Sequence, residues 1–256
     1  LGVNSANPQV VYVASHNGLL QRSEDGKWYW MGKQRADYMG FTADPNNPNR
    51  FYSSGHPPTG GNLGFQMSDS QGEDWKQISM PGVDFHALAI APSNSATFYG
   101  YPASRAEGLH VSTDGGKTWK RSRMEGLGDH PFNLVVDPQN ADQVYAVTQS
   151  GLYESHDHGE RWTLLPTTQN EPIVGLALQK EGDKTIMYGF RASQASTGIY
   201  RSLDDGKTWE KWSDGTDGLI LYLAISPQNS QVFYAVNQDN AIFQSQDGGK
   251  TWKVLS

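Results

Sequence analysis

The octet STDGGKTW, at residues 112–119, recurs along the chain and carries residue types that bind phosphate or metal ions in other proteins. A phosphate-binding loop places a glycine five residues before its Gly-Lys-Thr run. The three copies that contain this run have Val111, Arg201 and Gln244 at that position, so the octet is not a phosphate loop. A calcium loop needs more oxygen ligands and a late bidentate glutamate, which the octet lacks.

The chemistry left to the octet is that of a tight hairpin. Aspartate followed by glycine favours such turns, because glycine reaches positive φ and the carboxylate accepts N–H groups of the turn. The serine hydroxyl can bind the backbone in the same way, and the tryptophan can fold over the hairpin or wedge against a neighbouring unit. We expect this structural role for Ser112, Asp114, Gly116, Trp119, Ser155, Asp157, Trp162, Ser202, Asp204, Trp209, Ser245, Asp247 and Trp252.

Copies of the octet mark a repeat. They start at residues 23, 68, 112, 155, 202 and 245, and the first copy is irregular because its glycine is displaced to Gly26. An apolar residue followed by tyrosine recurs in phase, as at Phe98-Tyr99, after a short apolar run and a turn rich in proline and asparagine. Each unit therefore reads as four short strands, A to D, with the octet between C and D.

Four short strands in about 43 residues make one blade of a β-propeller. We therefore predict an all-β fold: a single six-bladed β-propeller domain over residues 1–256, with four antiparallel strands per blade and the octets in the C–D hairpins. Strand A of the first blade is short in the sequence. We expect blade six to pack on blade one without a strand exchanged between the ends of the chain.

Composition narrows the range of partners. The formal charge is -7 and no basic run is present, so nucleic acid and anionic membranes are poor partners. No apolar run approaches the ~20 residues that span a membrane, so we expect no membrane insertion. The absence of cysteine excludes disulfides and thiolate metal sites, and no motif calls for a cofactor. We expect a monomer. Because Leu1 is not methionine, we also expect that an N-terminal segment, such as a signal segment, is not present in this chain.

The octet pattern Ser-x-Asp-x-Gly-x-Thr-Trp resembles the BNR repeat, or Asp-box, of sialidases, xyloglucanases, sortilin-type receptors and a photosystem II assembly factor. The resemblance covers the whole chain and looks strongest to bacterial extracytoplasmic proteins labelled glycosyl-hydrolase-like BNR. It implies Asp-boxes at the rim, away from the active or binding face, and a secreted or cell-envelope location. It implies architecture and not activity.

Alternating strands place the Asp-boxes and the A–B turns on one face, and the B–C loops and D–A connections on the other. Three B–C loops are long, at 53–62, 100–108 and 189–198. On this second face we predict a ligand-binding set of Asp37, Tyr38, Asp84, His86, Arg105, Asp129, His130, Glu171, Arg191 and Tyr222. Imidazole binds zinc or copper, so the candidate metal ligands there are His16, His56, His86 and His130, although the spacing does not show whether they converge.

Two functions remain open. A glycoside hydrolase needs two carboxylates, about 5.5 Å or about 6.5–9.5 Å apart, which Asp37, Asp84, Asp129 and Glu171 could supply. The Arg-Ile-Pro motif that accompanies the sialidase arginines is absent, so a sialidase is not expected. A binding or assembly protein needs only a shaped face with polar anchors. We predict a non-catalytic extracytoplasmic protein that binds a carbohydrate or protein ligand opposite the Asp-boxes, with glycoside hydrolysis as the alternative.

Overall fold

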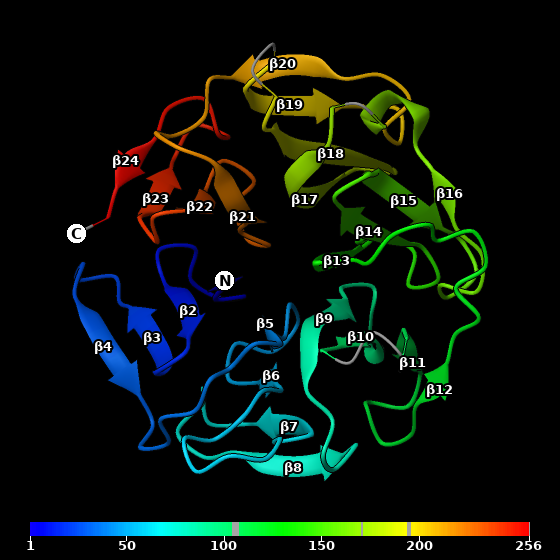
Figure 1. Ribbon diagram of the computed structural model, residues 1–256. Helices are drawn as coiled ribbons and strands as arrows, with labels where there is room; N and C mark the ends of the chain where they lie inside the picture. Colours follow the sequence, from blue (N-terminus) through cyan, green and yellow to red (C-terminus); the bar gives the residue numbers. More distant parts are fainter. Residues whose placement is uncertain (104–107, 170, 194–195, 256) are drawn as a thin grey trace.

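Six four-stranded antiparallel sheets surround a central axis in the computed structural model, which describes residues 1–103, 108–169, 171–193 and 196–255 (Figure 1). In each sheet the strands follow chain order, from the strand nearest the axis to the strand at the rim. The predicted all-β, six-bladed propeller is confirmed. Within the described residues, no helix is long and apolar enough to cross a membrane.

The blades follow one another along the chain. Blades one to three contain β1 (Gly2–Val3), β2 (Val11–Ser15), β3 (Gly18–Arg22), β4 (Trp28–Met31), β5 (Phe41–Ala43), β6 (Phe51–Ser53), β7 (Phe65–Ser68), β8 (Lys76–Ser79), β9 (Phe85–Ala91), β10 (Asn94–Pro102), β11 (His110–Ser112) and β12 (Lys120–Arg121). Blades four to six contain β13 (Asn133–Val136), β14 (Val144–Thr148), β15 (Gly151–Ser155), β16 (Thr163–Leu164), β17 (Ile173–Glu181), β18 (Lys184–Arg191), β19 (Gly198–Ser202), β20 (Glu210–Ser213), β21 (Ile220–Ile225), β22 (Phe233–Asn237), β23 (Ile242–Ser245) and β24 (Lys253–Val254). A short 3₁₀ turn, η2 (Pro166–Thr168), follows β16.

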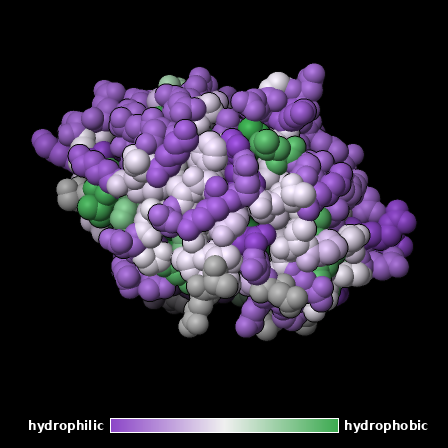
Figure 2. All heavy atoms as spheres, turned by 90° about the horizontal axis from the view of Figure 1, so that it is seen from above, coloured by the Kyte–Doolittle hydropathy of each residue, from purple (hydrophilic) through white to green (hydrophobic). Residues whose placement is uncertain are grey.

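The hydrophobic core lies between the blades. Each of the buried apolar clusters joins two neighbouring sheets, as where Tyr12 and Leu19 of blade one meet Phe51 of blade two. The tyrosine of the repeated apolar-tyrosine pair is buried in every blade. Figure 2 shows one side of the molecule, where hydrophilic residues dominate and hydrophobic ones form only scattered patches. Burial between sheets is therefore the main source of cohesion in the ring.

Ring closure joins blade six to blade one. Strand β1 pairs with β2, and β24 pairs with β23, so the sixth sheet takes all its strands from β21 to β24. Across this junction the Tyr234 hydroxyl donates to the Pro8 carbonyl at 2.9 Å, and Gln244 Nε2 donates to Gln9 Oε1 at 3.0 Å. The expectation of closure without an exchanged strand is confirmed for the part of the chain that the structure describes.

The octets form the C–D hairpins. In the copy between β11 and β12, Ser112 Oγ accepts the Gly116 N–H at 3.0 Å. The Asp114 carboxylate accepts the Thr118 hydroxyl at 2.6 Å and the Thr118 N–H at 2.9 Å. Since these bonds favour the ionised form, the Thr118 side chain and backbone, with the Ser112 hydroxyl, lower the pKa of Asp114 to about 2. The copies that start at Ser202 and Ser245 repeat this arrangement.

The octet also binds the preceding blade. The Gly116 carbonyl accepts the Ser79 hydroxyl of blade two at 2.5 Å and the Trp119 indole N–H of its own blade at 3.0 Å. We call the bond between a hydroxyl at the end of one blade and the octet glycine carbonyl of the next the interblade clasp. It recurs in three further pairs, Ser122 with Gly159, Thr167 with Gly206, and Ser213 with Gly249.

One face of the ring is occupied by these contacts. The A–B turns bond to the octets through backbone groups, as where Gly115 donates to Ala96 at 2.9 Å and His158 donates to Asp142 at 3.1 Å. Octets and A–B turns therefore share one face, as the alternation of strands predicts. The B–C loops and D–A connections are left to form the other face.

The two neighbouring glycines of the third octet provide a matched test of this packing. Both have positive φ, 80° at Gly115 and 77° at Gly116, so a change to alanine at either costs about 1–2 kcal/mol in backbone strain. A methyl group at Gly115 meets open space, whereas one at Gly116 overlaps the Phe65 ring of blade two. We expect Gly116→Ala to lower the free energy of unfolding in urea by about 1–3 kcal/mol more than Gly115→Ala does. Equal losses would contradict the packing role of Gly116.

The lowered pKa values of the Asp-box carboxylates predict that the stability of the fold depends on pH. The pKa of Asp114 and of Asp247 is about 2, below the ordinary 3.8, and that of Asp204 is also lowered. A lowered native pKa stabilises the fold above the unfolded pKa, and this contribution is lost as pH falls through the native pKa. A variant with all three changed to asparagine should therefore be less stable than the wild type at pH 7. The difference should shrink between about pH 5 and about pH 2 in urea titrations, and a constant difference would contradict the proposed carboxylate bonds.

Candidate functional site

Five side chains on the second face form a continuous series of imidazoles and carboxylates. His16 Nδ1 lies 2.6 Å from Asp37 Oδ2, and His56 Nε2 lies 3.4 Å from the same oxygen. On its other edge, His56 Nδ1 lies 3.2 Å from Asp84 Oδ2, and His86 Nε2 lies 3.0 Å from that atom. We call these five residues the histidine–aspartate chain. All five are among the residues singled out from the sequence.

Connections from three blades bring these side chains together. His16 lies in the turn between β2 and β3, and His56 follows β6, so both come from B–C loops. Asp37 and Asp84 lie in the D–A connections that lead to β5 and β9, and His86 lies in β9. The backbones of Asp37 and His56 also exchange hydrogen bonds, at 2.9 and 3.1 Å. The two kinds of connection therefore meet on one face, as predicted.

Burial of the Asp37 and Asp84 carboxylates lowers the stability of the fold. The Asp84 side chain is only 7% exposed, and the Oδ1 atoms of Asp37 and Asp84 are buried without a hydrogen-bond partner among the described residues. A buried polar atom without a partner is unfavourable by about 1–3 kcal/mol. The imidazoles at the Oδ2 atoms offset this cost. Such an arrangement does not maximise stability, which is typical of a functional surface.

The four candidate metal ligands do not lie in one cluster. His16, His56 and His86 belong to the histidine–aspartate chain, whereas His130 Nδ1 lies 2.7 Å from the Tyr101 hydroxyl. Each Oδ2 atom of the chain lies between two imidazole rings. Within the described ranges, no group of three or more histidine, aspartate or glutamate side chains has an arrangement that could hold a metal ion.

The other two predicted carboxylates have separate partners. Asp129 accepts the N–H groups of His130 at 2.7 Å and Ser150 at 3.0 Å. Burial opposes ionisation of Asp129, but these two bonds outweigh it and the pKa of Asp129 lies below its ordinary value. Glu171 forms an ion pair with Arg191, whose guanidinium also lies 4.6 Å above the Tyr200 ring.

Three further predicted residues differ in their surroundings. Tyr38 is only 3% exposed and packs against the Trp75 ring with centroids 5.2 Å apart, so the structure places it in the core between blades one and two. Burial raises its pKa to about 12. Tyr222 is 47% exposed within β21. Arg105 lies outside the described residues.

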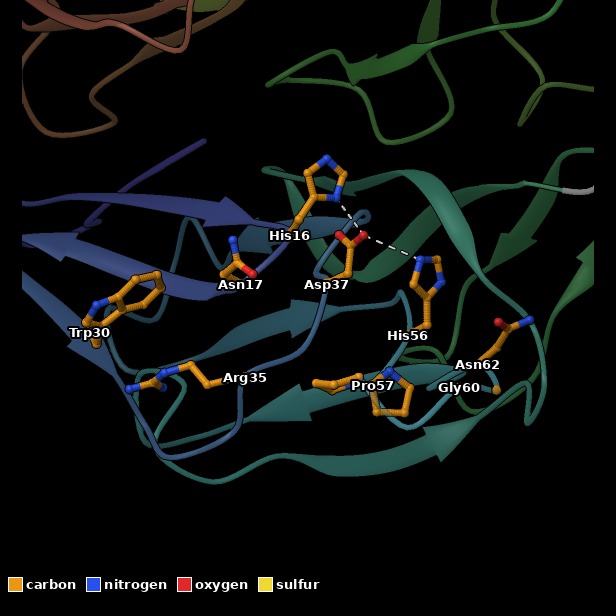
Figure 3. A pocket seen from close by; sticks show the side chains of 11 residues that line it. His16, Asn17, Trp30, Arg35, Asp37, His56, Pro57, Gly60 and Asn62 are labelled. Atoms are coloured by element: carbon orange, nitrogen blue, oxygen red, sulfur yellow. Dashed lines mark hydrogen bonds and ion pairs between the residues drawn. The ribbon is translucent and has the colours of Figure 1, made fainter.

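A pocket of about 810 Å³ opens beside the histidine–aspartate chain, between blades one and two (Figure 3). Figure 3 shows Trp30 and Arg35 on one side of it and His56 and Asn62 on the other. Part of its wall comes from the long B–C loop at 53–62, one of the three noted in the sequence. The residues that line it are His16, Asn17, Trp30, Arg35, Asp37, His56, Pro57, Pro58, Gly60, Gly61 and Asn62.

Trp30 ends the first octet copy, residues 23–30, so the repeat predicts a scaffold role for it, and no sequence pattern points to Arg35. In the third and fourth octets the tryptophan precedes strand D, and its indole N–H bonds to the octet glycine carbonyl. The first copy has a shorter turn and β4 already begins at Trp28, so Trp30 lies within the strand and is 48% exposed. The displaced glycine, Gly26, is the signal that could have shown this change of role.

Comparison with known proteins supports the repeat and the wider resemblance. The family model of the BNR/Asp-box repeat matches residues 110–121, which include the third octet. The xyloglucanase Xgh74A of Acetivibrio thermocellus is 26% identical over 223 residues, 82% of this chain and 24% of that protein. The photosystem II assembly protein Ycf48 of a Synechococcus strain is 25% identical over 181 residues, 70% of this chain and 52% of that protein. The chain thus spans about a quarter of the first relative and about half of the second.

Solved structures agree on the architecture. The GH74 enzyme of Niastella koreensis superposes with a TM-score of 0.69 at 18% identity, over 99% of this chain and 44% of that one. A chain of a nidogen/laminin complex gives 0.66 at 10% identity, over 92% of this chain and 88% of that one. At such identities the likeness shows the fold alone. The protein is a six-bladed β-propeller that carries the BNR/Asp-box repeat and is similar in sequence to xyloglucanases and to Ycf48.

Proposed function

We propose that this propeller is a non-catalytic, extracytoplasmic protein that binds a carbohydrate or protein ligand on the face of the histidine–aspartate chain. The observation that carries the proposal is the position of His56 between Asp37 and Asp84. Both carboxylates contact this one imidazole ring, which lies between them. The location outside the cytoplasm rests on the resemblance to extracytoplasmic BNR proteins.

A hydrolase would need a different arrangement. Two carboxylates that cleave a glycosidic bond must face each other across the substrate, and one of them must be held protonated by a raised pKa. Here the His56 ring lies where the bond would have to pass. Asp129 has a lowered pKa, and Glu171 is held by Arg191. The carboxylates of this face are thus engaged as hydrogen-bond acceptors, a role that suits the shaping of a surface.

The pocket supplies what binding requires. An open cavity of about 810 Å³, with an exposed indole, amides and charged side chains at its edge, can hold a small ligand or a segment of a larger one. The names of the relatives include a xyloglucanase and an assembly protein, so the comparisons are compatible with either ligand class. Because the chain spans about a quarter of the xyloglucanase, hydrolysis by that protein is not carried over to this one.

The proposal predicts how binding responds to the central imidazole. A saccharide array and a peptide array should each be probed with the wild type, with His56→Ala and with His156→Ala. His156 is the matched control because it is exposed and lies in an octet on the opposite face. We expect at least one array class to be captured, and His56→Ala to weaken that capture about tenfold, since a charge-assisted bond contributes about 1.5–3 kcal/mol. His156→Ala should leave it unchanged.

Catalysis is tested in the same preparation. Incubation with xyloglucan oligosaccharides should release no new reducing ends. The proposal fails if the wild type releases them and either Asp37→Asn or Asp84→Asn abolishes the release. It also fails if neither array captures the wild type, or if His56→Ala and His156→Ala bind as the wild type does.

A further inference from the structure

Trp30 and Arg35 form a fixed pair at one side of the pocket. The Arg35 guanidinium carbon lies 5.0 Å from the centroid of the Trp30 ring, and Arg35 Nη1 donates to the Gly32 carbonyl at 2.8 Å. Its other two hydrogen bonds also go to backbone carbonyls. Among the ion pairs of the described residues, none includes Arg35. The guanidinium is therefore held in position while its charge is not neutralised by a carboxylate.

The backbone of blade one is shaped for this pair. Gly18, at the start of β3, has φ 125°, and a Cβ atom there would lie 3.3 Å from Arg35 Cδ and 3.4 Å from the Trp30 ring. The positive φ favours glycine at this position, and both side chains pack closely over it. Trp30 has left the scaffold role of the other octet tryptophans, and its ring is half exposed beside the pocket. The exposure of this indole is not explained by packing of the core.

The remaining pocket residues determine what could lie against this pair. Pro57 adds an apolar surface, and the amide groups of Asn17 and Asn62 and the exposed His16 ring add polar groups. His16 and His56 both contact the same oxygen of Asp37. Among the described residues, the cationic side chain of the pocket that has no carboxylate partner is therefore Arg35. An indole face binds the C–H surface of a sugar ring, amides bind hydroxyl groups, and a guanidinium binds a carboxylate through a bidentate pair.

We infer that this pocket binds a short acidic saccharide, with a sugar carboxylate on the Arg35 guanidinium and a sugar ring against Trp30. The inference rests on the proposed binding function and narrows its ligand class. The volume of about 810 Å³ lies within the range of small-ligand sites, roughly 300–1,000 Å³, and has room for two or three sugar rings. Arg35 makes the pocket prefer acidic over neutral saccharides. Trp30 contributes to the binding of both kinds.

Calorimetric titration of the whole chain tests this assignment. The acidic probes are trisaccharides of galacturonate, mannuronate and guluronate, the neutral probes are galactotriose and mannotriose, and a glutamate-rich hexapeptide represents acidic peptides. We expect at least one acidic trisaccharide to bind about tenfold or more tightly than either neutral trisaccharide. Arg35→Gln should weaken acidic binding by about 10- to 100-fold and remove this preference, since a hydrogen bond to a charged group is lost.

Two further variants separate the roles of charge and stacking. Trp30→Ala should weaken binding of acidic and neutral saccharides alike. Lys33→Gln is the matched control, because Lys33 is an exposed cation on the same connection that does not line the pocket. It should change acidic binding less than twofold. Equal effects of Arg35→Gln and Lys33→Gln would mean that the preference arises from the general field of the protein and would overturn the assignment.

Failure of this inference can be told apart from failure of the proposed function. If none of the acidic trisaccharides binds better than the neutral ones, or if the hexapeptide binds better than all of them, the acidic saccharide class is wrong. The proposed function then stands as long as another ligand depends on His56. If no ligand of any class binds in a manner that depends on His56, both are rejected.

Discussion

The interblade clasp is the directional contact on which the ring depends. No named strand of one sheet pairs with a strand of the next, and among the described residues an isolated bridge between Glu125 and Arg161 adds backbone pairing between blades three and four. Apolar clusters hold neighbouring blades together, but hydrophobic burial alone does not fix how one sheet is turned against the next. A hydroxyl bound to the octet glycine carbonyl supplies that orientation, and the same glycine makes room for an apolar side chain of the preceding blade, as Gly116 does for Phe65. The octet forms this contact at four of the junctions between blades.

The clasp also decides where recognition can occur. Its residues and the A–B turns occupy one face, so the variable connections are left on the other. There an acidic residue of a D–A connection bonds to the B–C loop or the end of strand B in the blade that the connection enters: Asp37 to His56, Asp129 to Ser150 and Glu171 to Arg191. The chemistry differs among these contacts, whereas the clasp is the same bond at the four junctions that have it. Variation of side chains from blade to blade suits a face that binds a specific ligand, whereas a repeated contact suits a structural role.

Most of the fold could be predicted from the sequence, because the period and the turn chemistry of the octet are local properties. The sharing of a face by His16, Asp37 and His56 could also be predicted, since it follows from the alternation of strands. Their direct contact could not, because the spacing between blades says nothing about side-chain direction. Tyr38 was placed on the surface although it packs on Trp75, since the sequence does not show that the connection turns inward after Asp37.

Trp30 illustrates a different limit. The repeat places Trp30 at the end of the first copy, but the turn is shorter and Trp30 lies within β4. Trp28 instead packs against the apolar cluster between blades six and one. An alignment compares residue types, whereas a role depends on where the strand begins. Arg35 was passed over for a related reason, because its importance arises only from the ring beneath it and the pocket beside it.

The junction between blades one and two has a mechanical consequence. Blades two to five supply the clasp hydroxyl, whereas blade one has Gly32, whose backbone lies against the Gly72 carbonyl. Among the described residues no hydroxyl or indole bonds to that oxygen. The pocket spans this same junction, from Trp30 to Asn62. A bound ligand would therefore connect two neighbouring blades that lack the clasp. Ligand binding would therefore raise the free energy of unfolding of the whole ring, and not only of the residues that contact the ligand.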